Sequence, residues 1–364
     1  MQKNDEYLNK DKVEKNIWLK RMDKIVKMLL TYPYKEKIRQ IYMRLKKIKL
    51  KKTTIRFIKK ISKWISSSWK IILTTVPSFL FFYYLIGSTF VENMDVSTGY
   101  AIPTEKTSKF ETTNSMAFII KREVDGKMWT PNLPIIFPAY ALDNMPNFQV
   151  GIIEAVRDIS SSMRKFIGIS EQQKKDIEEA YTLLRYSPYV WLLSKKSAFS
   201  IAPSSNSQYR KAAKELRKFN QDGLYVPTIS DLDRILQKIS KGLLELTHKN
   251  EEHQQENSSN WVDFKVDNLF YHNRGYAFAM WQISKALAFD FKEIILSSEA
   301  YTEWTYLISS LKKASEYKTI VIRNGDPNGI FSPNHLIIQN YYLSRALSSA
   351  EKIRNLLSKD ENAN

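Results

Sequence analysis

Cysteine is absent from the 364 residues of this chain. A disulfide framework, a thiolate metal site and a cysteine nucleophile are therefore excluded. The four histidines show neither H-x-x-x-H nor H-E-x-x-H spacing, and the glycines form no phosphate-binding loop. We therefore expect no bound metal and no cofactor.

Acidic residues are scarce in the N-terminal part of the chain. Residues 1–70 carry 22 Lys and Arg against 6 Asp and Glu, whereas the rest of the chain carries 34 against 32. The formal charge of +18 thus belongs to an N-terminal arm, residues 1–70, and the body is almost neutral. Basic residues alternate with Ile, Leu, Phe and Trp over residues 35–70, which predicts an amphipathic helix on an anionic lipid surface. One alternative is a solvated arm that only sets the topology of the chain. Nucleic-acid binding by this arm is the weaker alternative.

Charged side chains are missing altogether from residues 71–91, IILTTVPSFLFFYYLIGSTFV. As a helix, this stretch would be about 32 Å long, against a hydrocarbon core of roughly 30 Å. Twelve of its residues are Ile, Leu, Val or Phe. A buried helix of a soluble core is the alternative, but such a helix normally keeps one polar face. We predict a transmembrane span.

The flanks of this stretch predict its orientation. The twenty residues before it contain seven Lys or Arg, and the twenty after it contain two. By the positive-inside rule, the N-terminus is expected in the cytoplasm and residues 92–364 on the other side of the membrane. Because no small-residue cleavage site follows, the sequence predicts an uncleaved signal anchor.

The body, residues 92–364, shows almost no strand-type alternation, which predicts an all-α helical bundle. Helix starts, stops and apolar periodicity predict helices near residues 112–124, 146–167, 171–185, 207–220, 230–248, 267–289, 298–315 and 334–357. Ser170 and Gln173 form a predicted capping box. The polar segment 249–260 is expected to be an exposed loop, and the turn cluster at 325–329 a short hairpin.

Two groups of polar residues are candidates for chemistry. Glu154 and Asp158 are four residues apart on a predicted helix, and such a pair could carry out acid–base work on a glycan. The alternative is an Arg157 ion pair beside ordinary helix charges. Asp267, His272 and Arg274 form the second group, before a predicted break at Gly275. This group could make hydrogen bonds that orient the start of a helix, or it could form a polar cluster that binds a ligand.

Four stretches carry a resemblance to a known family: residues 142–158 (LDNMPNFQVGIIEAVRD), 205–216 (SNSQYRKAAKEL), 269–291 (LFYHNRGYAFAMWQISKALAFDF) and 328–357 (NGIFSPNHLIIQNYYLSRALSSAEKIRNLL). In order and spacing they resemble the bacterial inner-membrane family called domain of unknown function 2333. We refer to the following as the motif residues, candidates for binding or structural roles: Asp143, Asn144, Pro146, Asn147, Arg157, Tyr271, Arg274, Gly275, Asn334, His335, Asn340, Tyr341 and Arg345.

The resemblance covers about residues 71–357 and implies a single-pass inner-membrane protein of Gram-negative bacteria with a periplasmic helical body. It implies no enzyme activity. The chain differs from the family pattern in its long basic arm and in the loosely matching region 171–200. The resulting prediction is a non-enzymatic envelope scaffold or adaptor that binds an envelope protein or glycan. The alternative is a periplasmic hydrolase of glycan or peptidoglycan that uses Glu154 and Asp158.

Overall fold

The computed structural model describes residues 52–91, 93–105, 109–138, 143–191, 202–221, 225–257, 265–318, 322 and 334–363. The chain divides into two compact units, Met1–Ser78 and Phe79–Asn364. Of the predicted lipid-binding arm, residues 35–51 lie outside the described part, and residues 52–70 are helical. Lipid binding by this arm stays a prediction.

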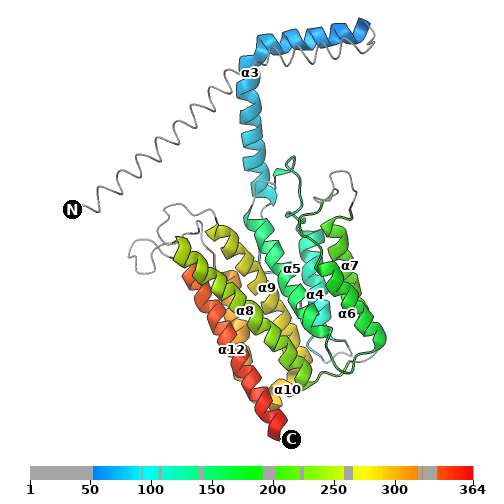
Figure 1. The fold of residues 1–364 in the computed structure, drawn as a ribbon, viewed down its shortest axis with the longest axis vertical. Helices are drawn as coiled ribbons and strands as arrows, with labels where there is room; N and C mark the ends of the chain where they lie inside the picture. Colours follow the sequence, from blue (N-terminus) through cyan, green and yellow to red (C-terminus); the bar gives the residue numbers. More distant parts are fainter. Residues whose placement is uncertain are drawn as a thin grey trace, which may run out of the picture. The chain divides into compact units, whose positions relative to one another are not determined.

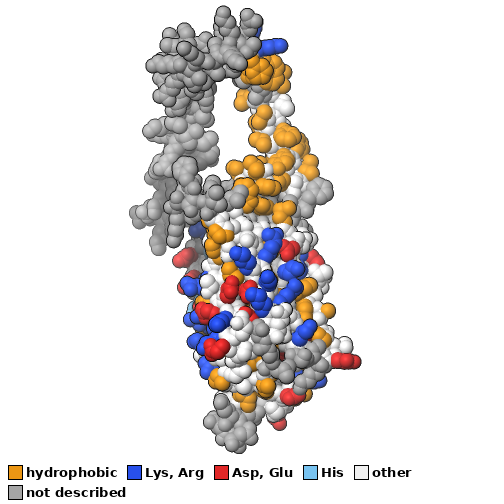
Figure 2. Space-filling model, turned by 90° about the vertical axis from the view of Figure 1, so that its right-hand side faces the viewer, with side chains coloured by type: hydrophobic (Ala, Val, Ile, Leu, Met, Phe, Trp, Pro, Cys, Tyr) orange, Lys and Arg blue, Asp and Glu red, His pale blue; other side chains and the backbone are white. Residues whose placement is uncertain are grey.

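Helix α3 (Lys52–Val91) contains the charge-free stretch, with Pro77 inside it. Figure 2 shows hydrophobic side chains covering much of the described surface of this helix. Its exposed apolar side chains within the stretch are those of Ile71, Leu73, Val76, Phe79, Leu80, Phe81, Phe82, Leu85 and Ile86. Among the described residues, no helix was found that is long and apolar enough to cross a membrane. The span predicted for residues 71–91 therefore remains a prediction.

The body is built from helices, and its described part contains no β-strand (Figure 1). The all-α prediction is thus confirmed. The helices are α4 (Glu111–Lys121), a π-helical turn (Arg122–Gly126), α5 (Asn144–Met163), α6 (Glu171–Leu184), α7 (Ser205–Lys218), α8 (Ile229–Asn257), α9 (Val266–Asp290), α10 (Lys292–Ser297), α11 (Tyr301–Glu316) and α12 (His335–Ala363).

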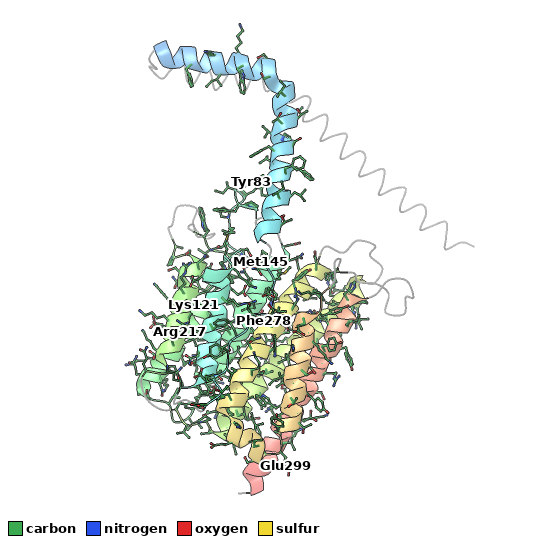
Figure 3. All side chains as sticks on the ribbon, turned by 180° about the vertical axis from the view of Figure 1, so that it is seen from behind. Tyr83, Lys121, Met145, Arg217, Phe278 and Glu299 are labelled. Atoms are coloured by element: carbon green, nitrogen blue, oxygen red, sulfur yellow. The ribbon has the colours of Figure 1, made fainter. Side chains whose placement is uncertain are left out.

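Helix α5 lies in the middle of the bundle, where it packs most extensively on α9 and also on α8 and α6. Helices α8, α11 and α12 lie on one side of it, and α4, α6 and α7 on the other (Figure 1). Met145 and Glu299 mark the two ends of the bundle (Figure 3). The core is apolar and aromatic, with fully buried side chains such as Phe148, Phe270 and Phe278.

Capping explains the start of two helices. Ser170 and Gln173 form the predicted capping box of α6, with the Ser170 hydroxyl accepting from the Gln173 N–H at 3.1 Å. Helix α4 is capped by a side chain from another helix. The Asp290 carboxylate, from the end of α9, accepts the N–H groups of Glu111 at 2.9 Å and Thr112 at 2.7 Å. A side chain distant in sequence thus replaces the local cap.

Two local predictions were wrong. The segment 249–260 was expected to be an exposed loop, but α8 continues to Asn257, because polar residues here pair with other helices. Asn250, for example, is fully buried. Gly275 was expected to break a helix, but it lies inside α9. The predicted hairpin at 325–329 lies outside the described residues.

Candidate functional site

Helices α5 and α9 cross at two glycines. A Cβ atom added to Gly151 would lie 2.0 Å from the carbonyl oxygen of His272, and one added to Gly275 would lie 1.9 Å from that of Phe148. The two backbones therefore touch, and a side chain at either position would push the helices apart. This crossing brings two of the family-like stretches together, residues 142–158 and 269–291.

Glu154 faces α9 from this crossing. Its carboxylate lies 2.8 Å from Nε2 of His272 and 2.8 Å from a guanidinium nitrogen of Arg157. The hydrogen bond with His272 lowers the pKa of Glu154 to about 2, and the charges of His272, Arg157 and Lys249 act in the same direction against the effect of burial. Glu154 is therefore ionised at neutral pH.

Asp158, one turn further along α5, has different partners. Its carboxylate lies 3.0 Å from Nζ of Lys238 on α8 and accepts the hydroxyl of Tyr276 on α9 at 3.1 Å. Burial raises the pKa of Asp158, and Lys238 opposes this shift. The predicted carboxylate pair is thus engaged in two separate sets of contacts.

An open groove of about 620 Å³ lies beside Glu154, where α5 and α9 begin and α8 ends. Lysines and glutamates both line it, so its charge is mixed. The motif residue Asn147 reaches across to α9, donating to Oδ1 of Asn268 at 2.7 Å. The full lining is Asn147, Lys249, Glu252, His253, Glu256, Lys265, Asn268, Leu269 and His272. Among the described residues, no group of His, Cys, Asp or Glu side chains is arranged to hold a metal ion.

A chain of side-chain amides connects α8, α9 and α12 behind this groove. The Asn273 amide donates to Asn250 at 2.7 Å and to Gln339 at 3.2 Å, and Asn250 donates to the motif residue Asn340 at 3.1 Å. Asn250, Asn273 and Gln339 are all fully buried. Because unpaired buried amides are costly, this chain fixes the register of the three helices.

Arg274 holds a different contact. Its Nε donates to the carbonyl oxygen of Ser315, at the end of α11, at 2.8 Å, and its guanidinium reaches the carbonyl oxygen of Met94 at 3.4 Å. Burial lowers the pKa of Arg274. His272 instead binds Glu154, so the predicted cluster of Asp267, His272 and Arg274 does not converge on one ligand position. His272 thus connects α9 to α5, and Arg274 connects α9 to the end of α11 and to Met94.

The remaining motif residues divide into buried and exposed ones. Asn334 caps α12, accepting the N–H of Ile337 at 3.0 Å. Asn144 and Pro146 lie in the first turn of α5, and the exposed Asp143 precedes them. Tyr271 packs on Phe270. His335 lies beside Tyr317. Tyr341 and Arg345 are exposed on α12, where Arg345 donates to the Tyr341 hydroxyl at 3.4 Å.

A buried ion cluster at the end of α4 was missed in the sequence. Glu123 is fully buried and lies 2.6 Å from Arg122 and 3.9 Å from Lys127, with the Gln149 amide at 3.3 Å. Burial lowers the pKa of Lys127 to about 8. Only the π-helical turn, which sequence periodicity does not reveal, brings these charges inside.

The sequence of the chain matches the model of a protein family. The model for domain of unknown function 2333, described as an uncharacterized protein conserved in bacteria, matches residues 125–227 and 230–360. The chain belongs to this family. The match contains every motif residue, which confirms the resemblance from residue 125 onward. Residues 71–124, which the resemblance was also expected to cover, lie outside the match. Neither a curated protein nor a solved structure matches the chain.

Proposed function

We propose that this DUF2333 chain is a membrane-attached, non-enzymatic scaffold or adaptor whose helical body binds another component of the bacterial cell envelope. The proposal rests on one observation: the two candidate catalytic carboxylates are each held by other side chains of the body. Glu154 is committed to His272 and Arg157, and Asp158 to Lys238 and Tyr276. A carboxylate pair for glycan hydrolysis needs two groups that face one bond. This geometry gives the hydrolase alternative no support.

Apolar surface supports attachment to the inner membrane. Besides the exposed apolar side chains of α3, Ile135 and Ile136 in the connector before α5 are 61% and 65% exposed. Tyr83 donates its hydroxyl to the carbonyl oxygen of Ile136 at 2.7 Å, and Tyr84 donates to that of Ile135. The connector backbone is thus partly satisfied beside an apolar helix, as a lipid environment requires. We propose that lipid covers both segments.

The sequence supplies the orientation in this proposal. Residues 71–91 would span the inner membrane, the basic residues 35–70 would bind anionic lipid on the cytoplasmic side, and the body would lie in the periplasm. The groove beside Glu154 would then be open to periplasmic partners. Its mixed charge and its volume of about 620 Å³ suit a polar peptide segment or a glycan.

Membrane attachment can be tested on the full-length chain. The double variant Phe81→Arg/Phe82→Arg puts two cations in the apolar stretch, at about 2.5–3.5 kcal/mol each for a residue at the bilayer centre. We expect the wild type to stay with membranes after alkaline carbonate washing and the variant to be released. Val226→Arg/Leu296→Arg, at two exposed apolar positions of the body, is the matched control. Release of the wild type by carbonate would overturn the attachment.

Orientation and partner binding need two further measurements. Alkaline phosphatase fused after residue 364 should be active, and a cytoplasmic reporter at the same point should be inactive; the opposite pattern would refute a periplasmic body. A photo-crosslinking amino acid at Glu252, in the groove, should give a discrete cross-linked species in cells. The same amino acid at the exposed Glu179 of α6 should not. Identical patterns at both positions would remove the groove as the binding surface.

A further inference from the structure

A second pocket, of about 470 Å³, lies between the end of α5 and the beginning of α8. Four of its seven lining residues are cationic and none is acidic. The lining consists of Ser161, Ser162, Lys165, Arg234, Gln237, Lys238 and Lys241. We call it the basic pocket. It shares no lining residue with the groove beside Glu154.

The cations of the basic pocket are poorly compensated. Lys238 has Asp158 at 3.0 Å, but the neighbouring Asp233 is paired with Arg354 at 2.8 Å. Lys165 and Lys241 are exposed, and no ion pair is described for either of them. Lys165, Arg234 and Lys241 therefore line the pocket without a described counter-ion, and like charges so close together repel one another.

Arg234 adds an independent sign of a ligand. Its Nε is buried and has no hydrogen-bond partner among the described residues. An unpaired buried donor is unfavourable, and more so when it is charged. The backbone at this point is fixed, because the buried Ser162 hydroxyl donates to the carbonyl oxygen of Arg234 at 3.2 Å. A preformed wall of α5 and α8 thus holds a guanidinium whose Nε lacks an acceptor.

We propose that the basic pocket binds the phosphate group of a soluble phosphorylated ligand. A phosphate dianion offers several strong acceptor oxygens and enough charge to compensate this many cations, which one carboxylate does not. The guanidinium of Arg234 is suited to bidentate phosphate binding, and the lysines supply mobile donors. The pocket volume is in the range of small-molecule sites, so it has room for more than the phosphate itself.

The position of the basic pocket favours a soluble ligand over a lipid headgroup. Sδ of Met145, at the start of α5, accepts the N–H of Asn93, just after α3. Ser161 lies about 24 Å further along α5, at 1.5 Å per residue. If the end of α3 lies in lipid as proposed above, the pocket is about 24 Å along α5 from the point where the chain leaves it. Only this choice of source rests on the proposed function; phosphate binding itself does not.

Calorimetric titration of the full-length protein in an uncharged maltoside detergent tests the proposal. The probes are inorganic phosphate and glucose 6-phosphate, with glucose as the uncharged control. Lys165→Ala/Lys241→Ala removes two exposed cations of the pocket, and Lys174→Ala/Lys175→Ala removes two exposed cations of α6. We expect saturable binding of glucose 6-phosphate, at least tenfold weaker in the pocket variant and unchanged in the α6 variant. Glucose should not bind.

Three outcomes would overturn the proposal. The first is the absence of saturable binding of both phosphate probes by the wild type. The second is an equal loss of affinity in the pocket and α6 variants, which would indicate a general charge effect. The third outcome concerns the source of the phosphate. We expect phosphatidylcholine vesicles containing phosphatidylglycerol to bind the wild type and the pocket variant equally. A loss confined to vesicle binding would identify a lipid headgroup instead of a soluble ligand.

Discussion

Glu154 and Asp158 lie one helical turn apart on α5, yet their surroundings shift their acidities in opposite directions. The hydrogen bond with His272 lowers the pKa of Glu154 to about 2, whereas burial raises the pKa of Asp158. The two carboxylates have side-chain exposures of 27% and 13%. Residue type and spacing are similar, so the difference comes from depth and from the charge of the partners.

The glycines near the two carboxylates also differ in their surroundings: those near Glu154 contact backbone atoms, and the one near Asp158 contacts a side chain. Near Glu154, Gly151 and Gly275 let the backbones of α5 and α9 touch. Near Asp158, a Cβ added to Gly242 would lie 1.9 Å from the hydroxyl of Tyr276, which is the end of a side chain. The Glu154 region is therefore held by backbone contact, and the Asp158 region by side chains that can adjust.

The largest effect is expected from alanine at these glycines. Gly275→Ala sets a methyl group against a backbone carbonyl, so it should destabilise the body by about 3 kcal/mol or more, the upper range for overpacking. Gly242→Ala displaces one tyrosine hydroxyl and should cost about 1–2 kcal/mol. Urea unfolding of the full-length protein in detergent measures both free energies.

Gly126→Ala is the control for this pair, because nothing lies within 4 Å of a Cβ added there. It should leave the free energy of unfolding within about 0.5 kcal/mol of the wild type. If Gly275→Ala were as mild as Gly126→Ala, α5 and α9 would not be in backbone contact in solution. The distinction between the two regions would then fail.

The pH dependence of stability should separate the two carboxylates next. The pKa of Glu154 is about 2 in the folded chain against a reference value of 4.5, so its stabilisation is present above pH 4.5 and lost as pH falls towards 2. The advantage of the wild type over Glu154→Gln should therefore grow with pH, to about 2 kcal/mol.

Asp158 should show the opposite trend. Its folded pKa lies above the reference value of 3.8, so ionisation of this group favours the unfolded state as pH rises through that range. The free energy of unfolding of the wild type should therefore fall relative to that of Asp158→Asn as pH rises. The same urea titrations measure this change. Two parallel pH profiles would show that the carboxylates share one environment.

Sequence patterns anticipated much of this region but not its partners. Capping and periodicity located α5 and α9, because both signals are local. The side of α5 shared by Glu154 and Asp158 also follows from helical spacing. The residues that complete each region, such as His272 and Lys238, are distant in sequence, and only tertiary packing selects them.

The same reason explains the errors and omissions. The segment 249–260 is as polar as a loop, and its helical state depends on an amide chain to Asn273 and Asn340. A glycine usually indicates a helix break, but Gly275 instead lets α9 contact the backbone of α5. The basic pocket combines residues near 161–165 with residues near 234–241, so no single window of sequence shows it.

The smallest effects should come from the cations. Lys238→Met leaves the largely buried Asp158 with only the Tyr276 hydroxyl described as its partner, and should cost about 1–2 kcal/mol of unfolding free energy. Arg157→Met leaves Glu154 with His272, and the Arg157 side chain is 35% exposed, so the cost should be about 0.5 kcal/mol or less. Methionine keeps the apolar stem in both variants, so urea unfolding compares the loss of charge alone. Equal costs would mean that depth does not distinguish the two ion pairs, and the contrast between the regions would then reside in their glycines.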